Sequence, residues 1–119
     1  MDPISLTIDA ARSAIQERKT TAMALAEAHY ARIQKEDGQI GAFLTLSKER
    51  ALEQADRIDR IAAEGKSLPP LAGVPVGIKD VMSTRGVRTT AGSKILEKYI
   101  PPYDCTAVQR LEGWLRAGR

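Results

Sequence analysis

Two ionisable side chains, Lys79 and Asp80, end a short apolar stretch in the second half of the chain. The alternation of Val76 and Ile78 with Gly77 predicts a strand that has the lysine at its end. Glycines in such a strand allow other backbone to approach closely, which favours burial of the lysine. Burial disfavours the ammonium form, and a neutral amine can take the proton of a serine hydroxyl. Lys79 is therefore a candidate general base.

A second interpretation of the same two residues involves no chemistry. A lysine at a strand end beside an aspartate is more often a surface charge or one half of a structural ion pair. Asp80 would then orient the loop or cap the turn that follows it. The residue types and their spacing leave both interpretations of Lys79 open.

Few other residues are candidates for catalysis or ligand binding. The chain contains one histidine, His29, and one cysteine, Cys105, which excludes an internal disulfide and a zinc site built from Cys and His. We interpret His29 as a structural histidine and Cys105 as a small packing residue, because no partner base or nucleophile accompanies either. Arg85 and Arg88 could hold an anion, but solvated loop arginines are the simpler interpretation.

The composition is that of a globular protein of one domain. The 119 residues carry a formal charge of +3, with nine Lys/Arg against ten Asp/Glu in residues 1–60 and nine against five in residues 61–119. The basic residues are scattered, which does not favour nucleic-acid binding by this chain alone. A signal peptide and an apolar stretch long enough to cross a membrane are both absent from the sequence, so we expect a cytoplasmic location.

Helical spacing of apolar residues predicts three helices in the first half, with Thr7, Thr21 and Ser47 as their N-caps. The second helix is expected to end near Asp37 and Gly38, and residues 40–46 are predicted to form a strand. The predicted buried faces are Ile8, Ala11 and Ile15 in the first helix, Ala22, Leu25, Ala26, Tyr30 and Ile33 in the second, and Ala51, Ala55, Ile58 and Ala62 in the third.

Glycine and proline recur between residues 65 and 104, which is typical of a loop-rich functional surface on a rigid scaffold. Asp104 is predicted to cap a last helix. We therefore predict one domain, mainly helical over residues 1–64, with the lysine loop and strand in 65–104 and a helix over 105–117. The order of elements indicates an α/β fold, in which helices surround a mixed central sheet, and a further strand is expected. The inner side of the last helix is predicted to be Ala107, Val108, Leu111 and Leu115.

The segment PLAGVPVGIKD, residues 70–80, resembles the lysine motif of the amidase-signature family. The likeness continues in TRGVRTTAGSKILE, residues 84–97, and PPYDCTAV, residues 101–108. Within that family, the parts RTT, SKIL and PPYD are most similar to the A-type subunits of tRNA-dependent amidotransferases. The helical half also resembles that family, so the likeness covers nearly the whole chain up to about Glu112. Residues 113–119 depart from it, which we interpret as a cut or a change of reading frame.

The resemblance implies the N-terminal part of the amidase-signature fold, truncated, and a Ser–cis-Ser–Lys triad in which Lys79 is the catalytic lysine. The two serines would belong to a glycine- and serine-rich segment that this sequence lacks. Ser83 and Ser93 are the only serines after the lysine, and neither lies in such a segment. We therefore expect the chain alone to be inactive.

The parent enzyme implied by the resemblance hydrolyses glutamine and supplies ammonia for transamidation of misacylated Glu-tRNA(Gln) or Asp-tRNA(Asn). Its partners would be the B-type and C-type subunits, with tRNA bound mainly through the complex and no membrane contact. ATP and Mg would be bound by one of these partners, and this chain would hold no cofactor or metal. Two alternatives remain open at this point, a fragment of a general amide hydrolase and a non-catalytic binding or assembly module.

Overall fold

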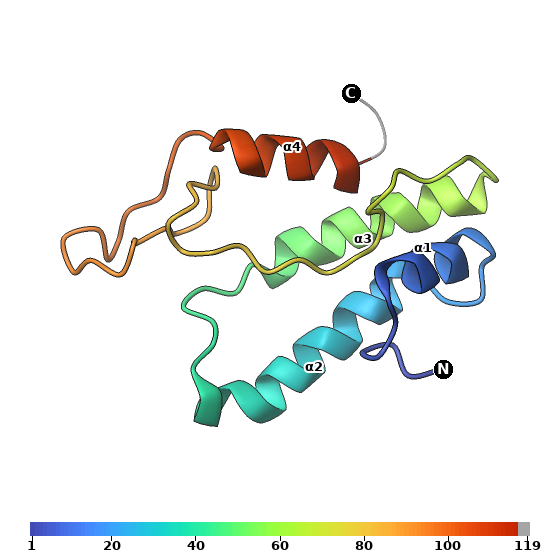
Figure 1. Ribbon diagram of the computed structural model, residues 1–119, viewed down its shortest axis with the longest axis horizontal. Coiled ribbons are helices and arrows are strands. Elements are labelled where there is room, and N and C mark those ends of the chain that lie inside the picture. The colour runs from blue at the N-terminus through green and yellow to red at the C-terminus, as the bar shows by residue number, and fades with distance from the viewer. Residues whose placement is uncertain (117–119) are drawn as a thin grey trace.

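The computed structural model describes residues 1–116, which form four helices (Figure 1). They are α1 (Ile8–Gln16), α2 (Ala22–Ile40), α3 (Lys48–Ala63) and α4 (Thr106–Leu115). Helices α2 and α3 pack against each other as an antiparallel pair, and α1 also contacts α3. A long irregular segment joins α3 to α4. In this described part, none of the helices has the length and apolar character that a membrane span requires.

Threonine side chains cap the first two helices as the sequence predicts. The hydroxyl of Thr7 accepts the N–H of Ala10 at 3.2 Å, and the hydroxyl of Thr21 accepts the N–H of Ala24 at 3.0 Å. Each bond satisfies an amide that has no carbonyl partner in the first helical turn. Ser47 occupies the N-cap position of α3, also as predicted, but its side chain makes no capping hydrogen bond.

The predicted cap of the last helix is wrong by one residue. Asp104 does not cap α4, because its carboxylate accepts the backbone N–H of Arg85 at 2.7 Å, and Cys105 takes the N-cap position instead. Ala107, which was predicted to be inside, is exposed. Helix α4 ends at Leu115 and Arg116 is extended, so the helix stops before residue 117, its predicted end, which itself lies outside the described residues.

The predicted strand at residues 40–46 is wrong. Helix α2 runs past its predicted end near Asp37 and Gly38 and ends at Ile40. The C-cap residue Gly41 follows, and its φ of +66° is the left-handed conformation common after helices. The carboxylate of Asp37 then accepts the N–H groups of Ala42 at 2.7 Å and Phe43 at 3.3 Å. These bonds satisfy the backbone locally, so the following residues stay irregular.

The predicted strand before Lys79 is also wrong. Among the described residues the only β-bridge is the isolated one of Thr84 with Val87, so no central sheet forms there. A strand needs a neighbouring strand to complete its hydrogen bonds, and the residues before Lys79 have none. Val76, Ile78 and Lys79 are consequently exposed, so the predicted enclosure of the lysine is not found either.

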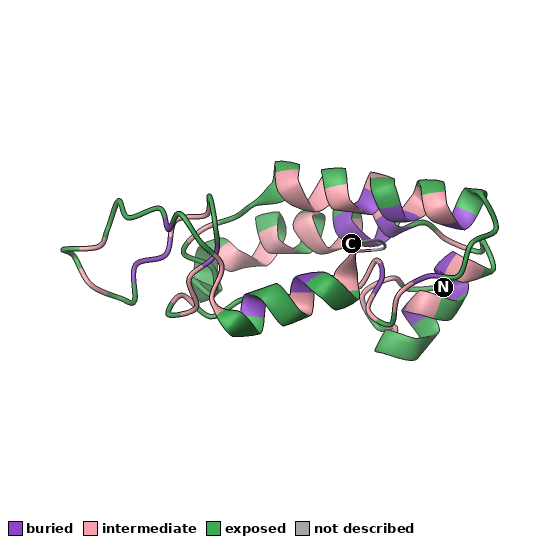
Figure 2. Ribbon diagram, turned by 90° about the horizontal axis from the view of Figure 1, so that it is seen from above, coloured by how far each residue is buried: buried purple, intermediate pink, exposed green. Residues whose placement is uncertain are grey.

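The hydrophobic core lies at one end of the molecule, where α1 meets the start of α2 and the end of α3 (Figure 2). Most predicted inward faces are confirmed, but Ile8 is 52% exposed, and Tyr30, Ile33 and Ala51 are only partly buried. The loop after α3 closes the core through Leu68. The buried cluster consists of Ala11, Ile15, Ala22, Leu25, Ala26, Ala55, Ile58, Ala62, Leu68 and Ala72.

Two side chains of α1 hold that loop in place. The guanidinium of Arg12 donates to the carbonyls of Leu68 at 2.8 Å and Pro69 at 3.1 Å. The amide of Gln16 accepts the N–H of Leu68 at 2.9 Å and donates to the carbonyl of Lys66 at 3.0 Å. The lysine segment therefore starts from a fixed point on the core.

Candidate functional site

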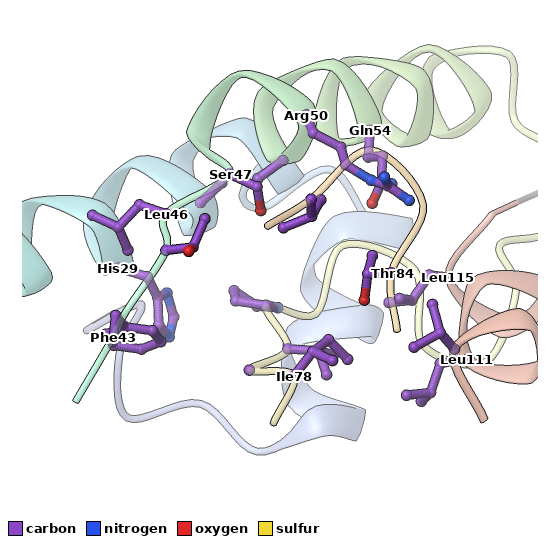
Figure 3. A pocket seen from close by; sticks show the side chains of 18 of the residues that line it. His29, Phe43, Leu46, Ser47, Arg50, Gln54, Ile78, Thr84, Leu111 and Leu115 are labelled. Carbon is purple, nitrogen blue, oxygen red and sulfur yellow. The ribbon is translucent and has the colours of Figure 1, made fainter. Parts of the chain in front are cut away.

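A cleft of about 520 Å³ lies between α2, α3, α4 and the irregular segments that precede and follow the lysine (Figure 3). Its apolar wall includes Phe43, Leu46, Ile78, Leu111 and Leu115. The polar side chains around it include His29, Ser47, Arg50, Gln54 and Thr84. A mainly apolar cleft with a few polar groups is the usual form of a binding site, and it is also the form of an unfilled packing surface.

Lys79 lies at this cleft and is exposed. Its carbonyl accepts the N–H of Met82 at 2.9 Å, which begins a turn. No ion pair within residues 1–116 involves Lys79. The suggested ion pair with Asp80 is therefore not found.

Asp80 bonds instead to a turn that lies ten to twelve residues further along the chain. Its carboxylate accepts the Thr90 N–H at 2.8 Å, the Thr90 hydroxyl, and the Gly92 N–H at 3.4 Å. The Thr90 hydroxyl, followed by the Thr90 amide, lowers the pKa of the Asp80 carboxyl, because both hydrogen bonds favour its charged form. Asp80 therefore orients the loop, one of the two roles suggested for it from the sequence.

The two loop arginines are engaged with the protein's own backbone. Arg85 donates to the carbonyl of Pro102 at 3.1 Å. Arg88 donates to the carbonyl of Glu97 and, across the cleft, to that of Leu44 at 3.3 Å. Both guanidinium groups thus bind backbone carbonyls, within the loop for Arg85 and also in the α2–α3 connection for Arg88, and neither simply points into solvent as the sequence suggested.

The serines after the lysine do not line the cleft. The Ser83 hydroxyl donates to the Tyr103 hydroxyl at 3.4 Å, and the Ser93 hydroxyl accepts the N–H of Ile95 at 3.3 Å. Ser47 does line it, and no sequence pattern indicates this, because α3 is brought to the lysine segment only by tertiary packing.

His29 and Cys105 have ordinary structural surroundings. The Nδ1 atom of His29 lies 2.7 Å from the carbonyl of Leu25, one turn earlier on the same helix, so the ring bonds to its own helix. Cys105 is partly buried and its N–H donates to the carbonyl of Ser83 at 2.9 Å. Residues 1–116 contain no group of three or more His, Cys, Asp or Glu side chains arranged to hold a metal ion.

A buried acid that no sequence pattern singles out closes the α4 side of the cleft. Glu112 is 8% exposed and pairs with Arg50 of α3 at 2.8 Å and with Arg116 at 2.5 Å. Arg50 also donates to the carbonyl of Arg85 at 2.8 Å. These contacts join α3, the loop and α4 into one wall.

Most of the chain matches one protein family. The model of the Amidase family matches residues 24–114, which include the lysine segment and the rest of the irregular segment between α3 and α4. The chain therefore belongs to the amidase family, as its motifs indicate.

Its relatives define the branch of that family. Over 112 residues the chain is 65% identical to the A-type subunit of glutamyl-tRNA(Gln) amidotransferase from Koribacter versatilis (strain Ellin345), a match that covers 94% of this chain and 23% of the relative. It is 46% identical over 111 residues to the protein of that name from Streptomyces coelicolor, covering 93% of this chain and 22% of the relative. The chain thus spans under a quarter of these relatives, in their N-terminal portion.

A solved structure agrees with these relatives. It is described as an unexpected vestigial protein complex that reveals the evolutionary origins of an s-triazine catabolic enzyme, in an inhibitor-bound form. One of its chains matches with a TM-score of 0.86 and 37% identity, over 92% of this chain and 24% of that chain. Most of this chain therefore follows the course of part of a larger chain of known structure.

Proposed function

We propose that this chain provides the general base, Lys79, of a glutamine-hydrolysing amidase. The ammonia released by the complete enzyme would serve to transamidate glutamate or aspartate misacylated on tRNA, in the cytoplasm. The observation that carries the proposal is the 65% identity over 112 residues to the A-type subunit of a glutamyl-tRNA(Gln) amidotransferase. B-type and C-type subunits, with ATP and Mg bound by a partner, would complete the reaction.

Lys79 would act through a serine pair that further polypeptide supplies. One serine attacks the amide carbon of glutamine, and the lysine takes its proton through the bridging serine and returns it to the departing ammonia. Water then cleaves the acyl-serine ester, which releases glutamate and frees the serine. Lys79 lines the cleft, is exposed and is free of ion pairs within residues 1–116, so a serine can reach it. This accessibility supports the assignment of the base.

The cleft would hold extended, apolar segments of the rest of an amidase polypeptide. Phe43, Leu46, Val76 and Ile78 are 43%, 51%, 42% and 39% exposed, an arrangement that is unfavourable in water. The N–H groups of residues 76–78 bond to no other backbone group of residues 1–116. Added strands would satisfy these groups and enclose the lysine, which fits the much greater length of the relatives.

The test is a graft of this chain in place of the matching N-terminal residues of the Koribacter versatilis protein, with glutamine hydrolysis as the assay. We expect the graft to be active and Lys79→Ala to lower kcat by about 10²–10⁴-fold, the usual contribution of a general base. Lys98→Ala, which also changes an exposed lysine of the loop, serves as the control and should keep full activity. The ungrafted chain should hydrolyse no glutamine, because a base without a nucleophile and an oxyanion hole does not lower the barrier usefully.

Two outcomes would favour the alternatives. If the chain restores activity when it is grafted into a general amide hydrolase, but not when it is grafted into the amidotransferase subunit, the parent is a general amide hydrolase. If Lys79→Ala keeps full glutaminase activity and still assembles with the partner subunits, the chain is an assembly module and the proposed base is wrong.

A further inference from the structure

Asp80 connects the lysine segment to the turn at residues 90–92 through both its side chain and its backbone. The carboxylate accepts two bonds from Thr90 and one from Gly92, and the Asp80 carbonyl accepts the N–H of Ala91 at 2.9 Å. Ala91 has a φ of +51°, an unfavourable conformation for a residue with a side chain. These bonds hold the turn in that conformation against its cost.

The turn is itself fixed to the rest of the loop. Thr90 is only 4% exposed, and its hydroxyl also accepts the N–H of Gly92 at 3.1 Å. The preceding Thr89 donates its N–H to the carbonyl of Tyr99 at 3.0 Å, and Arg88 reaches across the cleft to Leu44. Asp80 therefore attaches the lysine segment to an anchored structure and not to a free loop.

Lys79 has little other support. It lies in no helix or strand, and within residues 1–116 its one backbone hydrogen bond is that from the N–H of Met82 to its carbonyl. The Asp80 oxygens are occupied by Thr90 and Gly92, and so the carboxylate is not paired with the lysine beside it. A paired carboxylate would favour the ammonium form of a lysine, in which the nitrogen cannot accept a proton.

We propose that Asp80 is a positioning residue for Lys79, and that it acts through Thr90. Its hydrogen bonds fix the backbone next to the lysine, and they keep the carboxylate away from the lysine amine. The inference rests on the proposed function of Lys79. Because a displacement of a catalytic group by about 1 Å can cost roughly 10²-fold in rate, loosening this support should be visible in kcat.

The experiment uses the same graft in the Koribacter versatilis protein, with kcat and KM for glutamine measured separately. Asp80→Asn and Thr90→Val are each expected to lower kcat by roughly 10–100-fold with little change in KM. Thr90→Ser keeps the hydroxyl and should restore kcat to near the starting value. The double variant should be no worse than the poorer single variant, because both changes break one unit.

Asp104→Asn is the matched control. The Asp104 carboxylate accepts the same type of backbone N–H bond in the same loop, but from Arg85 and not from the turn at residues 90–92. This variant should keep its kcat, because the positioning role depends on the hydrogen bonds of Asp80 and not on every hydrogen bond of the loop. Near-normal kcat in Asp80→Asn and Thr90→Val, with Lys79→Ala inactive, would overturn the positioning role and leave the proposed base intact. Full activity of Lys79→Ala would instead overturn the proposed function and this inference with it.

Discussion

Gly73 lies so close to Ile15 that a Cβ atom added at Gly73 would be 2.4 Å from the Cδ1 atom of Ile15. The same Cβ would be 3.0 Å from the Cβ of Ala22. Gly73 also has a φ of +74°, a backbone conformation that residues with a side chain rarely adopt. Glycine therefore lets the lysine segment cross directly over the junction of α1 and α2. The position of everything after it, Lys79 included, depends on this close approach.

Gly73→Ala should destabilise the protein by about 2–4 kcal/mol, since it adds a steric clash in the core to the cost of a left-handed conformation. Gly86→Ala is the control, because Gly86 has the same φ of +74° with no atom within 4 Å of an added Cβ. It should cost only about 1–2 kcal/mol. Urea unfolding of both variants measures the difference, and equal losses would contradict the steric argument.

Asp59→Ala should lower the free energy of unfolding by about 1–2 kcal/mol. The Asp59 carboxylate, on α3, accepts the N–H groups of Ala22 at 2.7 Å and Met23 at 3.0 Å, and so caps α2 from another helix. Asp56→Ala breaks only the exposed pair with Arg60 and should cost less than about 0.5 kcal/mol. Thermal unfolding that ranks these two variants in the opposite order would rule out the capping role.

The pair of Arg50 with Glu112 should be energetically coupled. Glu112→Gln is expected to cost about 1.5–3 kcal/mol, as for a hydrogen bond to a charged group in a buried setting. In a double-mutant cycle with Arg50→Met, the coupling should be about 0.5–3 kcal/mol. The exposed pair of Arg32 with Glu36 should give a coupling of at most about 0.5 kcal/mol in the same kind of cycle. A coupling between Arg50 and Glu112 that is no larger than this would contradict the prediction.

Thr90→Val should raise the pKa of the Asp80 carboxyl, because it removes the hydrogen bond that does most to lower that pKa. Asp80 has a lower pKa in the folded state, so its contribution to stability is present above its ordinary value of 3.8 and is lost as the pH falls through the folded value. The stability gap between wild type and Thr90→Val should thus be larger near neutral pH than in acid.

Carboxyl carbon NMR across an acid titration measures this pKa directly. Thr89→Val is the control, because the Thr89 hydroxyl donates to the carbonyl of Val87 at 3.0 Å and not to Asp80. An Asp80 pKa that is unchanged by Thr90→Val, or raised equally by Thr89→Val, would show that the hydroxyl is not the cause.

The helices and the family could be predicted from the order of residues alone. Thr7 and Thr21 cap their helices through atoms three residues away, and the stripe around Leu25 follows from helical periodicity. Such features depend on neighbours that are close in sequence, so they can be predicted without the fold. The lysine motif is also a continuous segment, and the match to the Amidase family over residues 24–114 confirms the family that it indicated.

The remaining features depend on contacts between distant parts of the chain. Apart from Ile40, which lies in α2, the segments predicted as strands before Ser47 and Lys79 remain irregular, because a strand depends on a partner that residues 1–116 do not provide. Asp104 does not cap the last helix because its carboxylate binds the N–H of Arg85. The carboxylate of Asp80 binds Thr90 and not the neighbouring Lys79. These contacts join residues ten to nineteen positions apart. No local pattern encodes such a pairing, because it depends on how the loop closes between α3 and α4.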